Sequence, residues 1–150
     1  MINILEGVTI KNLRGPLSVQ PVIFTAGQPT EAEIADMGRR GIRTVINLRP
    51  PSEQVGFDEA RLASDSGMAY VGIPVAGAAD LTIANAERLA STFETHSAPF
   101  FLHCAGGNRA GALLAVKVAR IDGYTVEQAL NLGVEAGMTD LYETVETLLR

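Results

Sequence analysis

Residues 100–111 read FFLHCAGGNRAG, and the fold of the whole chain can be worked out from this stretch. It begins as a short apolar run after Pro99, which predicts a buried strand. It continues into a small, glycine-rich turn and then into residues 112–121, an Ala/Leu/Val-rich run that predicts a buried helix. A strand, a tight loop and a helix therefore follow one another. The only cysteine of the chain, Cys104, stands where the strand ends.

The loop from Cys104 to Arg109 combines the features of an anion-binding site. Successive backbone N–H groups in a tight turn point into one concavity. The N-terminus of the following helix adds free N–H groups and a partial positive charge, and Gly106 and Gly107 let the backbone approach a ligand closely. Arg109 adds a planar, always charged group suited to tetrahedral oxyanions. The same field favours the thiolate of Cys104, the form that attacks.

The composition is that of an ordinary globular protein and excludes several functional classes. The chain has 150 residues, of which 47% are hydrophobic and 19% charged, and we expect one domain over residues 1–150. A net charge of −5 argues against nucleic acid and anionic membranes as partners. No apolar run has the length of a membrane span. No metal is predicted, because no cluster has metal-ligand spacing, and no cofactor is predicted either.

The cellular compartment is inferred from the N-terminus and from cysteine usage. The first eleven residues lack the basic start and apolar middle of a signal peptide. A single cysteine excludes an internal disulfide and is typical of a reducing compartment. We therefore expect a cytoplasmic protein; no oligomeric state is predicted.

Strands and helices are predicted to alternate along the chain. The predicted strands are 22–26, 42–48, 69–75 and 100–103. Three of the predicted helices follow the caps Thr30 (with Glu33 in a capping box), Thr125 and Thr139. Another starts at Leu81 or Thr82 and runs to about Thr95, and a further one covers 57–66. This alternation predicts a three-layer α/β domain around a mainly parallel sheet of about four to five strands. Ligands bind at the carboxyl ends of such strands, here residues 49–53, 75–80 and 104–109.

The motif His103-Cys104-x-x-Gly-x-Arg109 resembles the active-site loop of the cysteine-based phosphatases, the tyrosine and dual-specificity superfamily. The resemblance extends to residues 41–49 with Glu53, to the strand 70–75 that leads into the general-acid loop of those enzymes, and to 125–130. More narrowly, the order and lengths resemble a bacterial family of beta-lactamase-hydrolase-like, phosphatase-like domains. The resemblance implies a phosphatase-like fold, a Cys104 nucleophile and a phosphorylated or other small oxyanionic substrate.

Three positions depart from the phosphatase pattern. The superfamily has five residues between cysteine and arginine, whereas this chain has four, as in rhodanese-type sulfurtransferases. Ala110 stands where those phosphatases usually carry a hydroxyl that helps the thiolate leave. The general acid is expected just after Val75, yet Asp80 is the only aspartate of that loop.

The resemblance and the local chemistry together assign roles to residues of the loop and its surroundings. Cys104, Arg109 and Asp80 are the predicted catalytic residues, although Asp80 equally suits the start of a helix. His103 precedes the nucleophile on a strand, so its side chain should point away and support the loop. Arg49 is expected to form a structural ion pair with Glu53. The predicted substrate-binding residues are Ala105, Gly106, Gly107, Asn108 and Ala110.

Three functions remain open on the sequence. The first is a cysteine-dependent phosphatase, in which Cys104 attacks phosphorus and Arg109 holds the oxyanion. The second is a sulfurtransferase that carries a persulfide on Cys104, which needs neither a general acid nor a hydroxyl after the arginine. The third is an anion- or phospho-ligand-binding module that has lost the chemistry. We rank the phosphatase first because the resemblance covers most of the chain.

Overall fold

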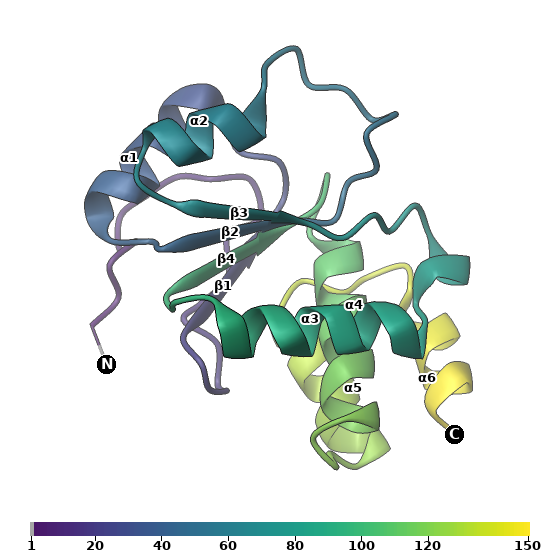
Figure 1. The fold of residues 1–150 in the computed structure, drawn as a ribbon. Helices are drawn as coiled ribbons and strands as arrows, with labels where there is room; N and C mark the ends of the chain where they lie inside the picture. Colours follow the sequence, from purple (N-terminus) through teal and green to yellow (C-terminus); the bar gives the residue numbers. More distant parts are fainter. Residues whose placement is uncertain (1) are drawn as a thin grey trace.

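A computed structural model describes residues 2–150 and contains a four-stranded parallel sheet (Figure 1). The strands β1 (Ile23–Ala26), β2 (Thr44–Asn47), β3 (Ala69–Gly72) and β4 (Phe100–His103) lie in the order β1-β4-β2-β3. Phe100 of β4 is aligned with Ile23 on one side and with Thr44 on the other. The predicted parallel α/β sheet is confirmed, and the strand that leads to Cys104 is one of its two central strands.

Helices cover both faces of the sheet, which gives the three layers that were predicted (Figure 1). One face carries α1 (Glu31–Arg40) and α2 (Glu59–Asp65). The other carries α3 (Ile83–Thr95), α4 (Asn108–Arg120), α5 (Val126–Glu135) and α6 (Tyr142–Leu149). A short 3₁₀ turn, η1 (Ala78–Asp80), follows β3.

Side-chain caps fix where most of the helices begin. Thr30 and Glu33 form both hydrogen bonds of a capping box before α1, and Gly41 ends that helix in the left-handed conformation at φ 110°. Thr82 and Thr125 cap α3 and α5. These residues satisfy backbone N–H groups that have no partner within the helix. The caps predicted at Thr30 and Thr125 are therefore confirmed, and the helix predicted to start at Leu81 or Thr82 begins directly after Thr82.

Three predicted helix boundaries are wrong. The helix predicted over 112–121 already begins at Asn108, within the loop. The helix predicted over 57–66 begins only at Glu59, because the Asp58 carboxylate accepts a hydrogen bond from the Arg61 N–H and so caps it. The last helix begins at Tyr142 and not after a Thr139 cap. The Asn108 side chain accepts hydrogen bonds from the backbone N–H groups of Thr139 and Leu141, at 2.8 and 3.2 Å. A tertiary contact therefore replaces the local cap.

The alternation of side chains along β4 separates Cys104 from its neighbour. Phe100, Leu102 and Cys104 belong to the core beneath α4, whereas Phe101 belongs to the core beneath α1 and α2. The His103 ring lies beside that of Phe101 and bonds to Glu59 of α2. The prediction that the His103 side chain points away from that of Cys104 is confirmed.

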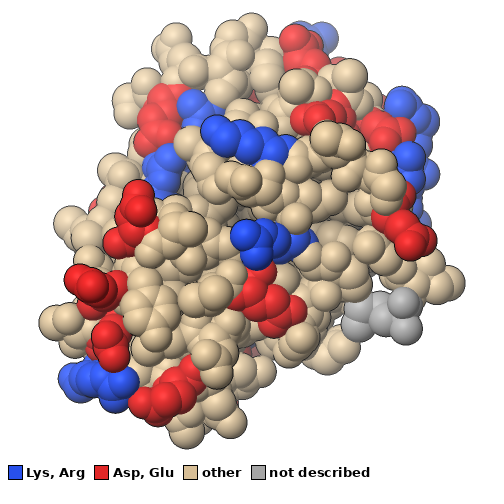
Figure 2. Space-filling view, turned by 180° about the vertical axis from the view of Figure 1, so that it is seen from behind, with Lys and Arg blue, Asp and Glu red and all other residues tan. Residues whose placement is uncertain are grey.

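The surface offers no large region of one charge on the face shown in Figure 2, where basic side chains lie beside acidic ones. Within residues 2–150, no helix is both long and apolar enough to cross a lipid bilayer. The same residues contain no group of three or more His, Cys, Asp or Glu side chains arranged to hold a metal ion.

Candidate active site

The loop after β4 turns sharply enough to place Cys104 directly below the start of α4. Gly107 adopts a left-handed conformation, with φ 96°, and α4 begins at the next residue. Only glycine adopts this conformation without a steric penalty. Cys104 is 1% exposed, so its sulfur lies at the bottom of the loop.

The carbonyl groups of the loop point outward and its N–H groups point inward. The Ala105 carbonyl accepts a hydrogen bond from the Gln28 N–H at 3.0 Å, and the Gly106 carbonyl accepts one from the Asn12 side chain at 2.9 Å. In a trans peptide the N–H points opposite to the carbonyl. The N–H groups of Gly106 and Gly107 are thereby turned into the loop. That of Gly107 donates to the Cys104 sulfur at 3.1 Å.

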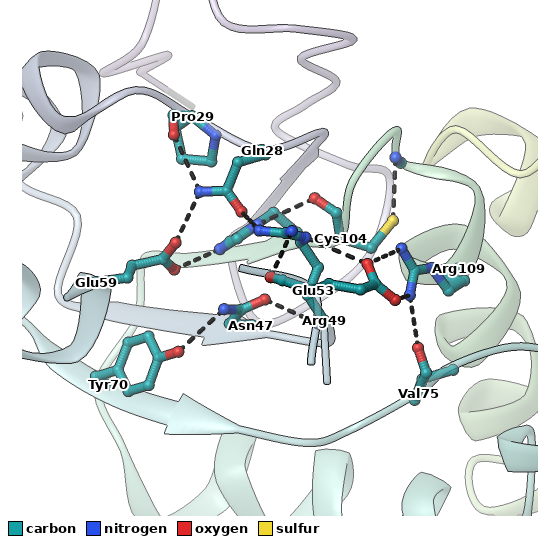
Figure 3. Close-up of polar contacts among 12 residues, drawn as sticks. Gln28, Pro29, Asn47, Arg49, Glu53, Glu59, Tyr70, Val75, Cys104 and Arg109 are labelled. Carbon is teal, nitrogen blue, oxygen red and sulfur yellow. Dashed lines mark hydrogen bonds and ion pairs between the residues drawn. The ribbon is translucent and has the colours of Figure 1, made fainter. Parts of the chain in front are cut away.

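Arg109 is held along one edge of its guanidinium by a carboxylate (Figure 3). Its two terminal nitrogens donate to the two Glu53 carboxylate oxygens at 2.8 and 2.9 Å, and Nη1 also donates to the Val75 carbonyl at 2.8 Å. An arginine has five N–H donors. The two that remain, on Nε and Nη2, lie on the other edge and are available to an oxyanion.

The Glu53–Arg109 pair shifts the pKa of both partners. Hydrogen bonds from Arg109 are the main cause that holds the pKa of Glu53 below its usual value, and Arg49 adds to this. The same pair raises the pKa of Arg109. Both groups are therefore charged at neutral pH, and the bidentate contact fixes the orientation of the arginine.

Arg49 supports Glu53 from the opposite side, as the sequence predicted. Its Nε lies 3.3 Å from a Glu53 carboxylate oxygen, and its Nη2 donates to the Glu53 carbonyl at 2.6 Å. Its Nη1 donates to the Gln28 side chain at 2.8 Å. The expected Arg49–Glu53 ion pair is confirmed. The bidentate bond between Glu53 and Arg109, which spans 56 residues of sequence, was missed.

A second carboxylate lies beneath the loop on the other face of the sheet. Glu59, from the first turn of α2, contacts His103 Nε2 at 2.6 Å and accepts a hydrogen bond from the Gln28 side chain at 2.8 Å. His103 Nδ1 lies 3.2 Å from the Cys104 carbonyl. Burial by itself raises the pKa of Glu59, but the bonds from His103 and Gln28 outweigh it and the pKa is lowered. Glu59 was not predicted as part of the site.

The remaining predicted residues have other contacts. Asn108 bonds to the segment before α6, as described above, and does not bond across the loop. Ala110 is fully buried in the core beside Cys104 and brings no hydroxyl there. Asp80 lies in the loop after β3 as predicted, but its carboxylate accepts a hydrogen bond from the Ala76 N–H at 2.8 Å. It thus closes its own loop in this conformation.

Some residues of the site were not predicted from the sequence. Gln28 follows β1, whose carboxyl end lies at the same edge of the sheet as the other strand ends. Counting that strand end among the candidates would have pointed to Gln28. Nothing in the local pattern marks Asn12 or Glu59, because an acidic residue in the first turn of a helix is usually explained by the helix dipole.

Several proteins of known structure are similar to this chain over most of its length. The DUF442 protein of Shewanella putrefaciens CN-32 superposes with a TM-score of 0.69 at 23% identity, covering 99% of this chain and 96% of that one. Kinase associated phosphatase gives a TM-score of 0.70 at 14% identity, covering 95% and 94%. P. aeruginosa TpbA, solved in complex with pTyr, gives 0.63 at 16% identity, covering 100% and 86%. These similarities establish the fold.

Sequence relatives are longer proteins. The Beta-lactamase hydrolase-like protein of Xylella fastidiosa is 37% identical over 102 residues, and that of Agrobacterium fabrum is 34% identical. In both cases the match covers 65% of this chain and 23% of the relative. The model of one protein family matches residues 14–121, which include every strand and the whole loop from Cys104 to Arg109. The chain therefore belongs to the family described as Beta-lactamase hydrolase-like protein, phosphatase-like domain.

Proposed function

We propose that this protein is a cysteine-dependent phosphatase that hydrolyses phosphate monoesters. The observation that carries the proposal is the loop itself, in which the Gly107 N–H donates to the Cys104 sulfur and Arg109 keeps two N–H donors that are not bonded to Glu53 or Val75. Donors fixed in this way stabilise the charge that develops on the phosphoryl oxygens in the transition state. The family to which the chain belongs supports the same reaction.

The reaction would proceed in two displacements. The Cys104 thiolate attacks phosphorus, a sulfur–phosphorus bond forms, and the bond to the leaving-group oxygen breaks. Asp80 is the candidate that protonates this oxygen, after its bond to the Ala76 N–H opens. Water then attacks phosphorus and gives a proton to the Asp80 carboxylate, the sulfur–phosphorus bond breaks, and phosphate and the thiolate are released. Arg109 holds the phosphoryl oxygens in both steps.

Turnover of 4-nitrophenyl phosphate tests the proposal. Cys104→Ser should reduce kcat/KM by roughly 10⁴-fold, since the nucleophile is lost. Arg109→Ala should reduce it by about 10²–10³-fold, the usual effect of removing an oxyanion donor. Arg39→Ala is the matched control, because Arg39 is an exposed arginine of α1 whose ion pair is with Asp36 of the same helix. Turnover that survives Cys104→Ser excludes the mechanism, and oxyanion binding with no turnover indicates a binding module.

Sulfur transfer is the second candidate, favoured by the loop of four residues between Cys104 and Arg109 and by the buried Ala110. In that reaction the Cys104 thiolate attacks the sulfane sulfur of thiosulfate, the sulfur–sulfur bond breaks, and sulfite leaves. Cyanide then removes the sulfur as thiocyanate and restores the thiolate. Mass spectrometry after thiosulfate treatment should show about 32 Da added to Cys104. No adduct and no thiocyanate excludes this candidate.

A further inference from the structure

A cleft adjoins the proposed active site on the side of β2 and β3. Its volume is about 720 Å³, within the range of small-molecule sites, which is roughly 300–1,000 Å³. The loop between β2 and α2 forms one wall, and Tyr70 and Pro74 from the region of β3 form another. Glu53 lines the cleft and also bonds to Arg109. Glu53 therefore stands at the boundary between this cleft and the arginine of the loop.

Apolar and aromatic side chains make up much of the wall. They include Pro50, Pro51, Val55, Phe57, Tyr70 and Pro74. The Tyr70 hydroxyl oxygen accepts a hydrogen bond from the Asn47 side chain at 3.0 Å, which leaves the hydroxyl hydrogen free to be donated (Figure 3). Burial raises the pKa of Tyr70, so this hydrogen is present at neutral pH. Such a lining suits an apolar, ring-containing body with a hydrogen-bond acceptor.

The charged residues of the cleft disfavour a second anionic group. Arg49 is the only basic residue in its lining, and three of its N–H groups are already bonded to Glu53 and Gln28. The lining also contains the carboxylates of Glu53, Asp58 and Glu59. Within residues 2–150, Asp58 is exposed and in no ion pair, its only side-chain bond being the cap at the Arg61 N–H. An anion in the cleft would meet an unneutralised carboxylate.

We propose that this cleft binds the body of the substrate that bears the phosphoryl group, and that it selects an apolar body that is uncharged or cationic over one with a second anionic group. The proposal rests on the phosphatase function proposed above. It assigns the substrate to monoesters with one phosphoryl group and separates it from compounds that carry a second anionic group. Glu53 connects the loop with the cleft. It contacts Arg109, the arginine that holds the phosphoryl group, and it also lines the cleft.

Binding of three non-hydrolysable benzylphosphonates tests this selectivity in the wild-type chain. They carry an aminomethyl, a carboxamide or a carboxylate group at the para position, so that the body is cationic, neutral or anionic at a similar size. We expect the aminomethyl compound to bind at least about threefold more tightly than the carboxylate compound, the effect of a partly exposed ion pair. Amide NMR signals of residues 54–58 and 70–72 should shift with the first two compounds.

Asp58→Asn is the decisive variant, because asparagine caps a helix as well as aspartate does and the fold should be retained. It should reduce the preference for the aminomethyl compound by about two- to fivefold. Asp65→Asn, an exposed acid at the other end of α2 that does not line the cleft, is the control and should leave the preference unchanged. Tyr70→Phe should weaken binding of the carboxamide compound.

The possible failures are distinguishable. Equal affinities for all three compounds, with NMR shifts confined to residues 104–109, overturn the cleft proposal and leave the phosphatase proposal standing. A charge preference that is unchanged by Asp58→Asn also overturns the assignment to this cleft. If neither the phosphonates nor inorganic phosphate bind, the proposed function itself is overturned.

Discussion

The two carboxylates that flank the catalytic loop, Glu53 and Glu59, lie six residues apart in sequence and act in different environments. The Glu53 side chain is 33% exposed and contacts Arg109, one free edge of which faces the proposed ligand. The Glu59 side chain is 5% exposed and contacts His103, which is fully buried. Gln28 bonds to both networks, through Arg49 on one side and Glu59 on the other.

The two contacts therefore have different roles. Glu53 orients the arginine that binds the ligand, whereas Glu59 holds the loop in place. A half-exposed ion pair contributes little to stability, because water solvates its members when they part. A buried pair contributes little when intact but is costly to break, because the remaining partner is left without solvation. Changes at Glu53 should therefore alter activity, and changes at Glu59 should alter folding.

The largest expected effect is on the stability of Glu59→Ala. Removing this carboxylate leaves the buried His103 nitrogen without a partner and should lower the free energy of unfolding by about 1–3 kcal/mol. Urea denaturation at pH 7 measures the loss. Glu53→Ala is the matched change and should cost no more than about 1 kcal/mol, as expected for a partly exposed pair. Equal losses in the two variants would refute the comparison.

The next effect is on the activity of Glu53→Gln. Glutamine keeps the shape of the side chain but loses the charge and one acceptor oxygen, so Arg109 is no longer fixed at both terminal nitrogens. We expect kcat/KM for 4-nitrophenyl phosphate to fall by about 10- to 100-fold, because small misplacements of catalytic groups are costly. The fold should remain stable. An unchanged kcat/KM would show that Arg109 needs no support from Glu53.

Acid should weaken the buried pair in a predictable pH window. The pKa of Glu59 is lower in the folded protein than in the unfolded chain, where it is about 4.3. The unfolded chain therefore takes up the proton first as the pH falls. The stabilisation that this pair contributes is fully present above the unfolded pKa of about 4.3. It is lost as the pH falls through the lower pKa of Glu59 in the folded protein. Urea titrations from pH 7 to pH 3 should show a steeper loss for the wild type than for Glu59→Gln; parallel curves would contradict this.

The smallest effect is the coupling between the two carboxylates through Gln28. A double-mutant cycle with Glu53→Gln and Glu59→Gln should give a coupling energy of about 0.5 kcal/mol, the lower limit for residues in one hydrogen-bond network. The same cycle in a Gln28→Ala background should give none. Coupling that persists without Gln28 would place its origin elsewhere, for instance in the backbone between residues 53 and 59.

Local signals were sufficient to predict the sheet and most of the helix starts. The capping box at Thr30 and the run FFLH before Cys104 depend on neighbours within a few residues, and both were identified. The start of α6 was wrong because Asn108, more than thirty residues away, accepts the hydrogen bonds that a local cap would have taken. The spacing of residues along the sequence does not reveal a contact over this distance.

In the site, too, contacts between residues close in sequence were predicted and contacts between distant residues were not. Cys104, the glycines and Arg109 lie in one loop, so their spacing alone predicted an anion site. Glu53 was correctly paired with Arg49 four residues earlier, but its stronger partner Arg109 is 56 residues away. Glu59 was missed because its burial depends on the packing of α2 over β4, which the composition of α2 does not reveal.

The outward-facing carbonyl groups of the loop also determine how its length can change. Ala105 and Gly106 are each anchored to a different segment, Gln28 after β1 and Asn12 near the N-terminus. Gly27 packs so closely against this loop that an added Cβ would lie 2.6 Å from the Ala105 oxygen. A fifth residue inserted between Ala105 and Gly106 would displace at least one of these anchors. Grafting a longer phosphatase loop onto this scaffold therefore requires a redesigned turn after β1 as well.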